Sequence, residues 1–159
     1  MRAIAARAAV DPALVIRYYG SKENLFLETM ILPANFTGLM ELPLPELAGA
    51  LVDYVVTRAG DAEHPATGHI YAGLVRASGM PLVREQLRQG VDAMVATLTP
   101  RLSGPEPELR ARLIAAQLGG LLTALYVLED GALRAESRER MVETFAPAIQ
   151  LLIDGPDPQ

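Results

Sequence analysis

The sequence predicts an all-α protein. Half of its 159 residues are hydrophobic, while only 5% are aromatic. Leucine, alanine and valine supply most of the hydrophobic half, and this composition suits packed helices better than a β-sandwich. Apolar residues also recur every three or four positions through long stretches of the chain, which is the spacing of one helix face.

The composition excludes several classes of protein. The chain has no cysteine, so disulfide frameworks and thiolate metal sites are excluded and a reducing cytoplasm is expected. Arg7, Asp11 and Pro12 interrupt the N-terminal segment before a signal-peptide core can form. No apolar run approaches the roughly 20 residues that span a bilayer. We therefore expect a cytoplasmic protein with no membrane partner and no cofactor.

Two short helices are expected at the N-terminus. Ile4 and Ala8 lie at helical spacing among good helix formers, and the sequence Val10-Asp11-Pro12 ends this first helix. Asp11 is a suitable N-cap for a second helix, whose first position is taken by Pro12, because proline lacks only an N–H that has no partner there. Gly20 is expected to end this second helix.

A third short helix and a long helical region follow. Ser21 is expected to cap the third helix, and Leu25, Phe26 and Met30 form its apolar face. Three prolines and one glycine make 33–45 the expected connection between helices. We therefore divide the chain into residues 1–32 and 33–159. Helical periodicity beyond it predicts longer helices over roughly 45–59, 66–78, 81–99, 106–129 and 136–153.

The N-terminal helices have the form of a helix-turn-helix. Arg17, Tyr18 and Lys22 are displayed near the end of the second helix, which in such motifs enters the major groove of DNA. Residues 1–30 carry a net charge of +1, whereas the remainder of the chain carries −6. This asymmetry suits a DNA-facing end joined to a body that phosphates repel.

The segment IAARAAVDPALVIRYYGSKENLF resembles the DNA-binding region of the TetR-like family of transcriptional regulators, and GSKENLF is its most specific part. The resemblance implies a supporting helix from Arg2 to Ala8 and a recognition helix from Pro12 to Tyr19. It also implies that Lys22 and Tyr18 contact DNA phosphates. The positions from which bases are recognised would be Arg2, Pro12, Ala13, Leu14 and Arg17.

The resemblance also implies which positions are buried, and the sequence departs from the family at several positions. Ile4, Val10, Val15 and Tyr19 match core positions of the family. Ala9 stands where the family usually has glycine, and Ile16 stands where a DNA-contacting tyrosine is common. The family also has a complete helix before this pair. We therefore expect a truncated chain or a mis-assigned start codon, and an exposed apolar patch at this end.

Two later segments, LRARLIAAQLGGLLTALYVLEDGAL and MVETFAPAIQLLIDGP, resemble the C-terminal helices of many actinobacterial-type members of the family. In those proteins the two helices and their symmetry mates form a four-helix dimer interface. A monomeric bundle with a central helix is the alternative. The expected interface residues are Leu118, Leu121, Leu122, Leu125, Ala146, Ile149 and Ile153.

A pocket for a small, partly apolar effector is expected among the helices between residues 45 and 129. The polar and aromatic candidates are Tyr54, His64, His69, Tyr71, Arg76 and Tyr126. Each of them is also compatible with an ordinary interior or surface position. The two histidines are five residues apart, which aligns them poorly on one helix face, so no metal site is expected.

These observations predict a DNA-binding repressor that acts as a homodimer on a palindromic operator and is released by its effector. Two alternatives stay open: a helical dimerisation module that has lost DNA binding with the missing first helix, and an effector-binding protein without affinity for DNA. An enzyme is not expected, because the chain has no nucleophile elbow, phosphate-binding glycine loop or HExxH sequence.

Overall fold

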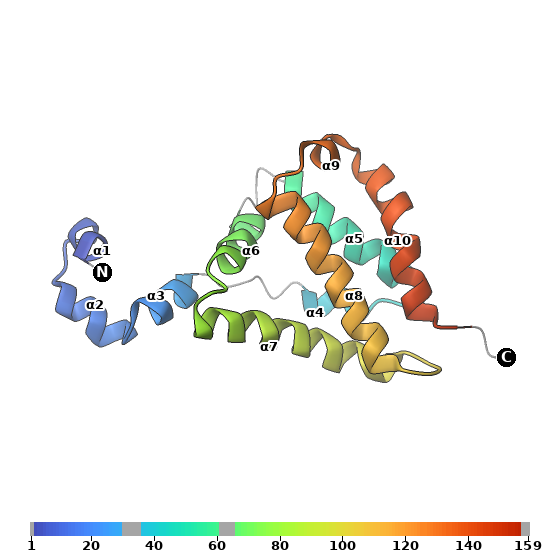
Figure 1. The fold of residues 1–159 in the computed structure, drawn as a ribbon, viewed down its shortest axis with the longest axis horizontal. Helices are drawn as coiled ribbons and strands as arrows, with labels where there is room; N and C mark the ends of the chain where they lie inside the picture. Colours follow the sequence, from blue (N-terminus) through green and yellow to red (C-terminus); the bar gives the residue numbers. More distant parts are fainter. Residues whose placement is uncertain (1, 30–35, 61–65, 157–159) are drawn as a thin grey trace.

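The computed structural model describes residues 2–29, 36–60 and 66–156, and the regular elements in these ranges are all helical. The all-α prediction is therefore confirmed. Three short N-terminal helices lie together at one end of the molecule, apart from a body of longer helices (Figure 1). We refer to residues 2–29 as the head and to the described residues from 36 onward as the body.

The head consists of α1 (Arg2–Arg7), α2 (Pro12–Tyr19) and α3 (Lys22–Thr29). The predicted caps are confirmed. The Asp11 carboxylate accepts a hydrogen bond from the amide of Ala13 at 2.6 Å, and Gly20 ends α2 with a φ of 71°. The Ser21 hydroxyl oxygen accepts a hydrogen bond from the amide of Asn24 at 3.0 Å and so caps α3.

Ala9 has left-handed backbone, with a φ of 53°. The amide of Val10 donates to the carbonyl of Ala5 at 3.0 Å, and the amide of Ala9 donates to the carbonyl of Ala6 at 3.3 Å. This pair of bonds is a Schellman motif, which satisfies the last carbonyls of α1. Glycine is favoured at the left-handed position, so the alanine costs about 1 kcal/mol there.

The body helices follow the predicted order, with three differences. A short helix α4 lies inside the expected connection. The predicted helix over 106–129 changes to a wider π-helical segment, η2, after Leu122. The carboxylate of Asp130 then caps a separate short helix, α9, before the final helix begins. The bounds are α4 Phe36–Leu39, α5 Leu44–Gly60, α6 Ala66–Arg76, α7 Pro81–Leu98, the 3₁₀ turn η1 Thr99–Arg101, α8 Pro107–Leu122, η2 Thr123–Val127, α9 Gly131–Ala135 and α10 Arg138–Asp154.

The core of the body is centred on α5, which contacts α8 and packs along α10. Leu47, Leu51 and Val55 recur every four residues on one face of α5, and all three are buried. Ile114 of α8 and Ile149 of α10 are buried in the same cluster. The periodicity of these helices therefore corresponds to a single shared core.

Arg110 is the charged residue that the described structure buries. Its guanidinium donates to the carbonyls of Leu152 at 3.1 Å and Ile153 at 3.2 Å, near the end of α10. It also donates to the carbonyls of Pro105, at 3.0 Å, and Ser103 in the loop before α8. Arg110 therefore satisfies carbonyls that the end of α10 leaves without helical partners.

The head has a much smaller core, formed by Ala5, Val15 and Leu25. Val15 is buried as expected, but Ile4, Val10 and Tyr19 are 44%, 38% and 38% exposed. The prediction that these three residues are core residues is therefore wrong. Within the described residues, α1 packs against α2 and α2 against α3, and α3 provides the main contact of the head with the body, through α7. No further described helix covers the outer sides of α1 and α2.

Candidate nucleic-acid interface and effector region

The face of α2 that points away from the head core combines a cation with apolar groups. Successive residues of an α-helix are rotated by about 100°. Because Val15 points into the core, Ala13 and Arg17, each about 160° away around the helix, fall on the opposite side, and Leu14, about 100° away, lies at the edge of this face. All three are exposed. A helix that entered a major groove would present this face to the base edges.

The head also exposes three cations and a tyrosine. Arg7, Arg17 and Lys22 are exposed, and none of them forms an ion pair within the part of the chain that the structure describes. Lys22 is the first residue of α3 and follows the last residue of α2, Tyr19, by three positions. Tyr18 is 79% exposed. Exposed cations without an ion-pair partner are suited to contact with phosphates.

The structure brings most of the predicted DNA-contacting residues together. Pro12 is the first residue of α2, and the others predicted on this helix follow it within two turns. Arg2 begins α1, and the placement of its side chain lies outside the described residues.

Three of the predicted effector residues are tyrosines of the body, and the hydroxyl groups of two of them bond to neighbouring helices. The Tyr71 hydroxyl donates to the carbonyl of Gly119 at 3.2 Å and lies 3.4 Å from Oγ1 of Thr123. The Tyr126 hydroxyl donates to the carbonyl of Val55 at 2.9 Å. Tyr54 is half-buried and packs against the main core. These tyrosines therefore join α5, α6 and the end of α8.

The remaining effector candidates are less informative. Arg76 is exposed at the end of α6, and its guanidinium lies 3.8 Å from the carboxylate of Glu129. His69 is on α6, but its side chain lies outside the described residues, and His64 lies outside them entirely. A search of the described part of the chain gives no group of three metal-ligating side chains.

The π-helical segment η2 contains Tyr126 and contacts α6. Periodicity does not predict this segment, because a single π-turn is too short to establish a period of its own. The pair Gly119-Gly120 just before it was the available signal, since both residues weaken helical preference. Single π-turns within α-helices are frequent at functional sites.

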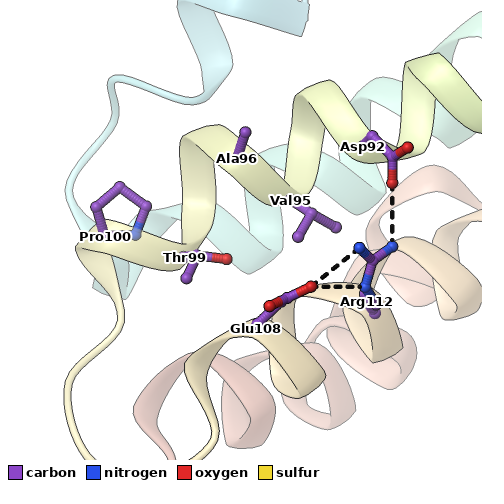
Figure 2. Close-up of a pocket in the computed structure, with 7 residues that line it drawn as sticks. All are labelled: Asp92, Val95, Ala96, Thr99, Pro100, Glu108 and Arg112. Carbon is purple, nitrogen blue, oxygen red and sulfur yellow. Dashed lines mark hydrogen bonds and ion pairs between the residues drawn. The ribbon is translucent and has the colours of Figure 1, made fainter.

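A separate cleft of about 470 Å³ lies between α7 and α8. Figure 2 shows Arg112 of α8 directed between Asp92 of α7 and Glu108 of its own helix. The guanidinium lies 3.1 Å from Asp92 and 3.0 Å from Glu108. The bond with Glu108, followed by that with Asp92, raises the pKa of Arg112 above its ordinary value. Val95, Ala96 and Pro100 provide the apolar part of the lining.

Thr99 contributes an unusual group to this cleft. Its Oγ1 atom is buried and has no hydrogen-bond partner. No other side-chain nitrogen or oxygen in the described residues is both buried and without a partner. A water molecule or a ligand hydroxyl in the cleft would satisfy it. The charged groups of the cleft already satisfy one another, however, so they provide little selectivity for a ligand.

The structure places most of the predicted dimer-interface residues inside one chain. Leu118, Leu121, Leu125, Ile149 and Ile153 are each at most 5% exposed, and Leu122 and Ala146 pack against the same core. The expectation that the five buried residues face a partner is therefore corrected, and for Leu122 and Ala146, which are only partly buried, it stays a prediction. The five buried residues turn inward because α5 covers the sides of α8 and α10 on which they lie.

The outward sides of α8 and α10 carry a different set of residues, which are exposed and uncharged. We call this set the outer face of α8 and α10; it consists of Leu109, Leu113, Ala116 and Gly120 on α8, and Thr144, Pro147, Ala148 and Leu151 on α10.

Among the described residues, no helix is both long enough and apolar enough to cross a membrane.

The N-terminal helix-turn-helix and the helical body define a transcriptional regulator. Residues 45–153 match the family described as tetracyclin repressor-like, C-terminal domain, and residues 1–29 match the bacterial regulatory proteins of the tetR family. The chain therefore belongs to the TetR family of bacterial regulatory proteins. Membership of this family places it among regulators and not among enzymes.

One similar solved structure is that of a TetR-family regulator from Streptomyces coelicolor A3. The two chains are 22% identical, with a TM-score of 0.48, and the match covers 94% of this chain and 80% of the other. No curated protein matches the chain.

Proposed function

We propose that this chain is a repressor that binds a palindromic DNA operator as a homodimer and releases it when a small molecule binds the body. The single observation that carries the proposal is the outward face of α2. It combines Arg17 and Ala13, opposite the buried Val15, with Leu14 at the edge of this face, in a chain of the TetR family.

The head residues take different roles in this proposal. Lys22 and Tyr18 contact phosphates and hold the head in register, since such contacts carry no sequence information. Arg17 and Arg2 are the residues that can form bidentate contacts with guanine, each worth about 1–3 kcal/mol of discrimination. Pro12, Ala13 and Leu14 can make only apolar contacts with bases through their side chains.

The outer face of α8 and α10 is the proposed dimer interface. A Cβ atom at Gly120 would meet nothing within 4 Å, so packing inside one chain does not require glycine there. Glycine within a helix costs about 1 kcal/mol relative to alanine. Close approach of a helix from a second copy would account for it. Two heads held at a fixed separation would match two half-sites about one DNA turn apart.

The effector is proposed to act near η2. Tyr54, Tyr71 and Tyr126 provide aromatic surface, and a ligand could exchange with the hydrogen bonds of Tyr71 and Tyr126 to Gly119 and Val55. His69 and Arg76 lie on the same helix as Tyr71. Because α6 contacts both η2 and α7, and α7 contacts α3, a shift of α6 has a direct route to the head. A typical coupling of about 1–3 kcal/mol between two such sites would be enough to release DNA.

One observation favours a second candidate, a dimerisation module without DNA binding. Among the residues whose side chains are described, the head core contains three, Ala5, Val15 and Leu25. A head held together so weakly would populate open states that do not bind DNA, and the body would retain its own interface.

The decisive experiment measures binding of the 159-residue chain to a pool of random-sequence DNA duplexes at two salt concentrations. We expect salt-sensitive binding and enrichment of a palindrome. Lys22→Ala should weaken binding of every sequence and reduce the dependence of log affinity on log salt by about one. The matched control is Arg134→Ala, which removes one exposed cation of α9, in the body, and should leave affinity unchanged.

If the chain binds no DNA yet remains a folded dimer, the dimerisation module is the correct function. Equal weakening by Lys22→Ala and Arg134→Ala would contradict the assigned role of Lys22.

A further inference from the structure

Leu14 is an exposed apolar residue of α2. Asp11 caps α2 and Val15 provides its buried contact, so both tasks of this short helix are performed by other residues. Leu14 is 42% exposed, and it lies about 100° around the helix from Val15 and about 60° from Arg17, at the edge of the outward face. A large apolar side chain that is exposed in the free protein gains most if another surface covers it on binding.

The chemistry of Leu14 selects among the four bases. A leucine side chain cannot donate or accept a hydrogen bond, so it favours the base that presents an apolar group in the major groove. Thymine presents its C5-methyl group there, whereas cytosine presents the N4 amino group. An amino group covered by leucine would lose its hydrogen bond to water without replacement. Thymine is therefore favoured and cytosine is penalised.

Arg17 lies one turn beyond Leu14 on the same face of α2. Three residues advance an α-helix by about 4.5 Å, while neighbouring base pairs are about 3.4 Å apart. The two side chains can therefore contact base pairs that are adjacent or separated by one. Arg17 has no ion-pair partner within the described residues and remains available for the N7 and O6 atoms of guanine.

We propose that each operator half-site contains a thymine whose methyl group is recognised by Leu14, with a contribution from Ala13, and a guanine one or two base pairs away that is recognised by Arg17. This inference rests on the proposed DNA-binding function and adds the base chemistry of the operator to it. The discrimination at the thymine then depends on one methyl group.

The test uses the palindrome that the 159-residue chain enriches from random duplexes. Each thymine of the palindrome is replaced in turn by deoxyuridine, which pairs identically but lacks the C5-methyl group. We expect about fourfold weaker binding for a contacted thymine, from the burial of one methyl group, and no change elsewhere. Replacing the neighbouring guanine by 7-deazaguanine removes the N7 acceptor and should weaken binding about tenfold.

Three variants assign the effects to residues. Leu14→Ala should bind thymine and deoxyuridine duplexes almost equally, because it removes the side chain that covers the methyl group. Arg17→Ala should lose the sensitivity to 7-deazaguanine and keep the sensitivity to deoxyuridine. The matched control, Leu128→Ala, truncates a leucine that is 72% exposed in the body and should retain both sensitivities.

The outcomes separate this inference from the function on which it rests. Binding to an enriched palindrome with no effect of deoxyuridine at any position would overturn the inference and leave the regulator function intact. Deoxyuridine sensitivity that persists in Leu14→Ala would overturn the assignment to Leu14. Failure to bind any DNA would overturn both.

Discussion

The guanidinium of Arg110 lies against the backbone of Gly155, so that a Cβ atom at Gly155 would come within 2.5 Å of Nη1 and 3.0 Å of Cζ. Gly155 also has a φ of 78°, which side chains rarely adopt. The C-terminal end of α10 is therefore shaped around a buried arginine on α8.

Gly155→Ala should lower the free energy of unfolding by about 1–3 kcal/mol, because the new methyl group meets Arg110 in a strained backbone conformation. Urea unfolding followed by circular dichroism measures the loss. The loss should be smaller in an Arg110→Met background, since the flexible methionine can move away. An equal loss in both backgrounds would mean that backbone strain, and not the contact with Arg110, sets the effect.

Ala9→Gly should stabilise the head by about 1 kcal/mol, because glycine adopts the left-handed conformation of residue 9 without the penalty that alanine incurs. The matched control is Ala6→Gly in the ordinary helical backbone of α1, which should destabilise by about the same amount. Amide hydrogen exchange in residues 2–29 reports on both. A destabilising Ala9→Gly would show that the Schellman turn after α1 does not persist in solution.

Leu113→Glu should prevent dimerisation, because it places a charge in the middle of the outer face of α8 and α10. Light scattering should give half the mass of the unmodified chain at the same concentration. Leu128→Glu places the same charge on an exposed leucine outside that face and should leave the mass unchanged. Dimers that survive Leu113→Glu would place the interface elsewhere on the body.

Glu85 should contribute to stability in a pH-dependent manner. Hydrogen bonds from Arg88, and then from Gln89, lower the pKa of Glu85 below its ordinary value of 4.5 in the folded chain. A lowered folded-state pKa means that the stabilisation is present above the unfolded-state pKa and is lost as the pH falls through the folded-state pKa.

The melting temperature of Glu85→Gln should therefore lie slightly below that of the unmodified chain at pH 7, and the difference should disappear in acid. Glu41→Gln, at an exposed glutamate of the body, is the control and should show no such difference. The carboxylate would be excluded as the cause if the difference in melting temperature between Glu85→Gln and the unmodified chain stayed constant from pH 7 into the acid range.

Local sequence signals predicted the helix boundaries because caps act over a few residues. Asp11, Gly20 and Ser21 perform the roles expected of them, and the left-handed Ala9 follows from its position at the end of α1. Burial depends on which element lies opposite a face, and periodicity alone does not contain that information. The resemblance to the family has the same limit: it assigned Ile4 and Val10 to a core, and no described helix lies opposite them, although Val15 was assigned correctly.

The same reason explains the errors in the body. The apolar face of α8 is wide, and the sequence could not tell which part of it contacts α5 and which part remains outside. Leu118 and Leu121 turn inward, whereas Leu113 stays exposed. The hydrogen bonds of Tyr71 to Gly119 and of Tyr126 to Val55 connect residues far apart in the chain. No local sequence pattern predicts such pairs.

Because the core of the head is much smaller than the core of the body, the head should open without unfolding of the body. Amide protons of α1–α3 should exchange with solvent through frequent local openings, while those of α5, α8 and α10 exchange only when the whole body unfolds. A ligand that binds only the closed head would suppress those openings in proportion to its concentration. In this chain the nucleic acid would complete the folding of the domain that recognises it.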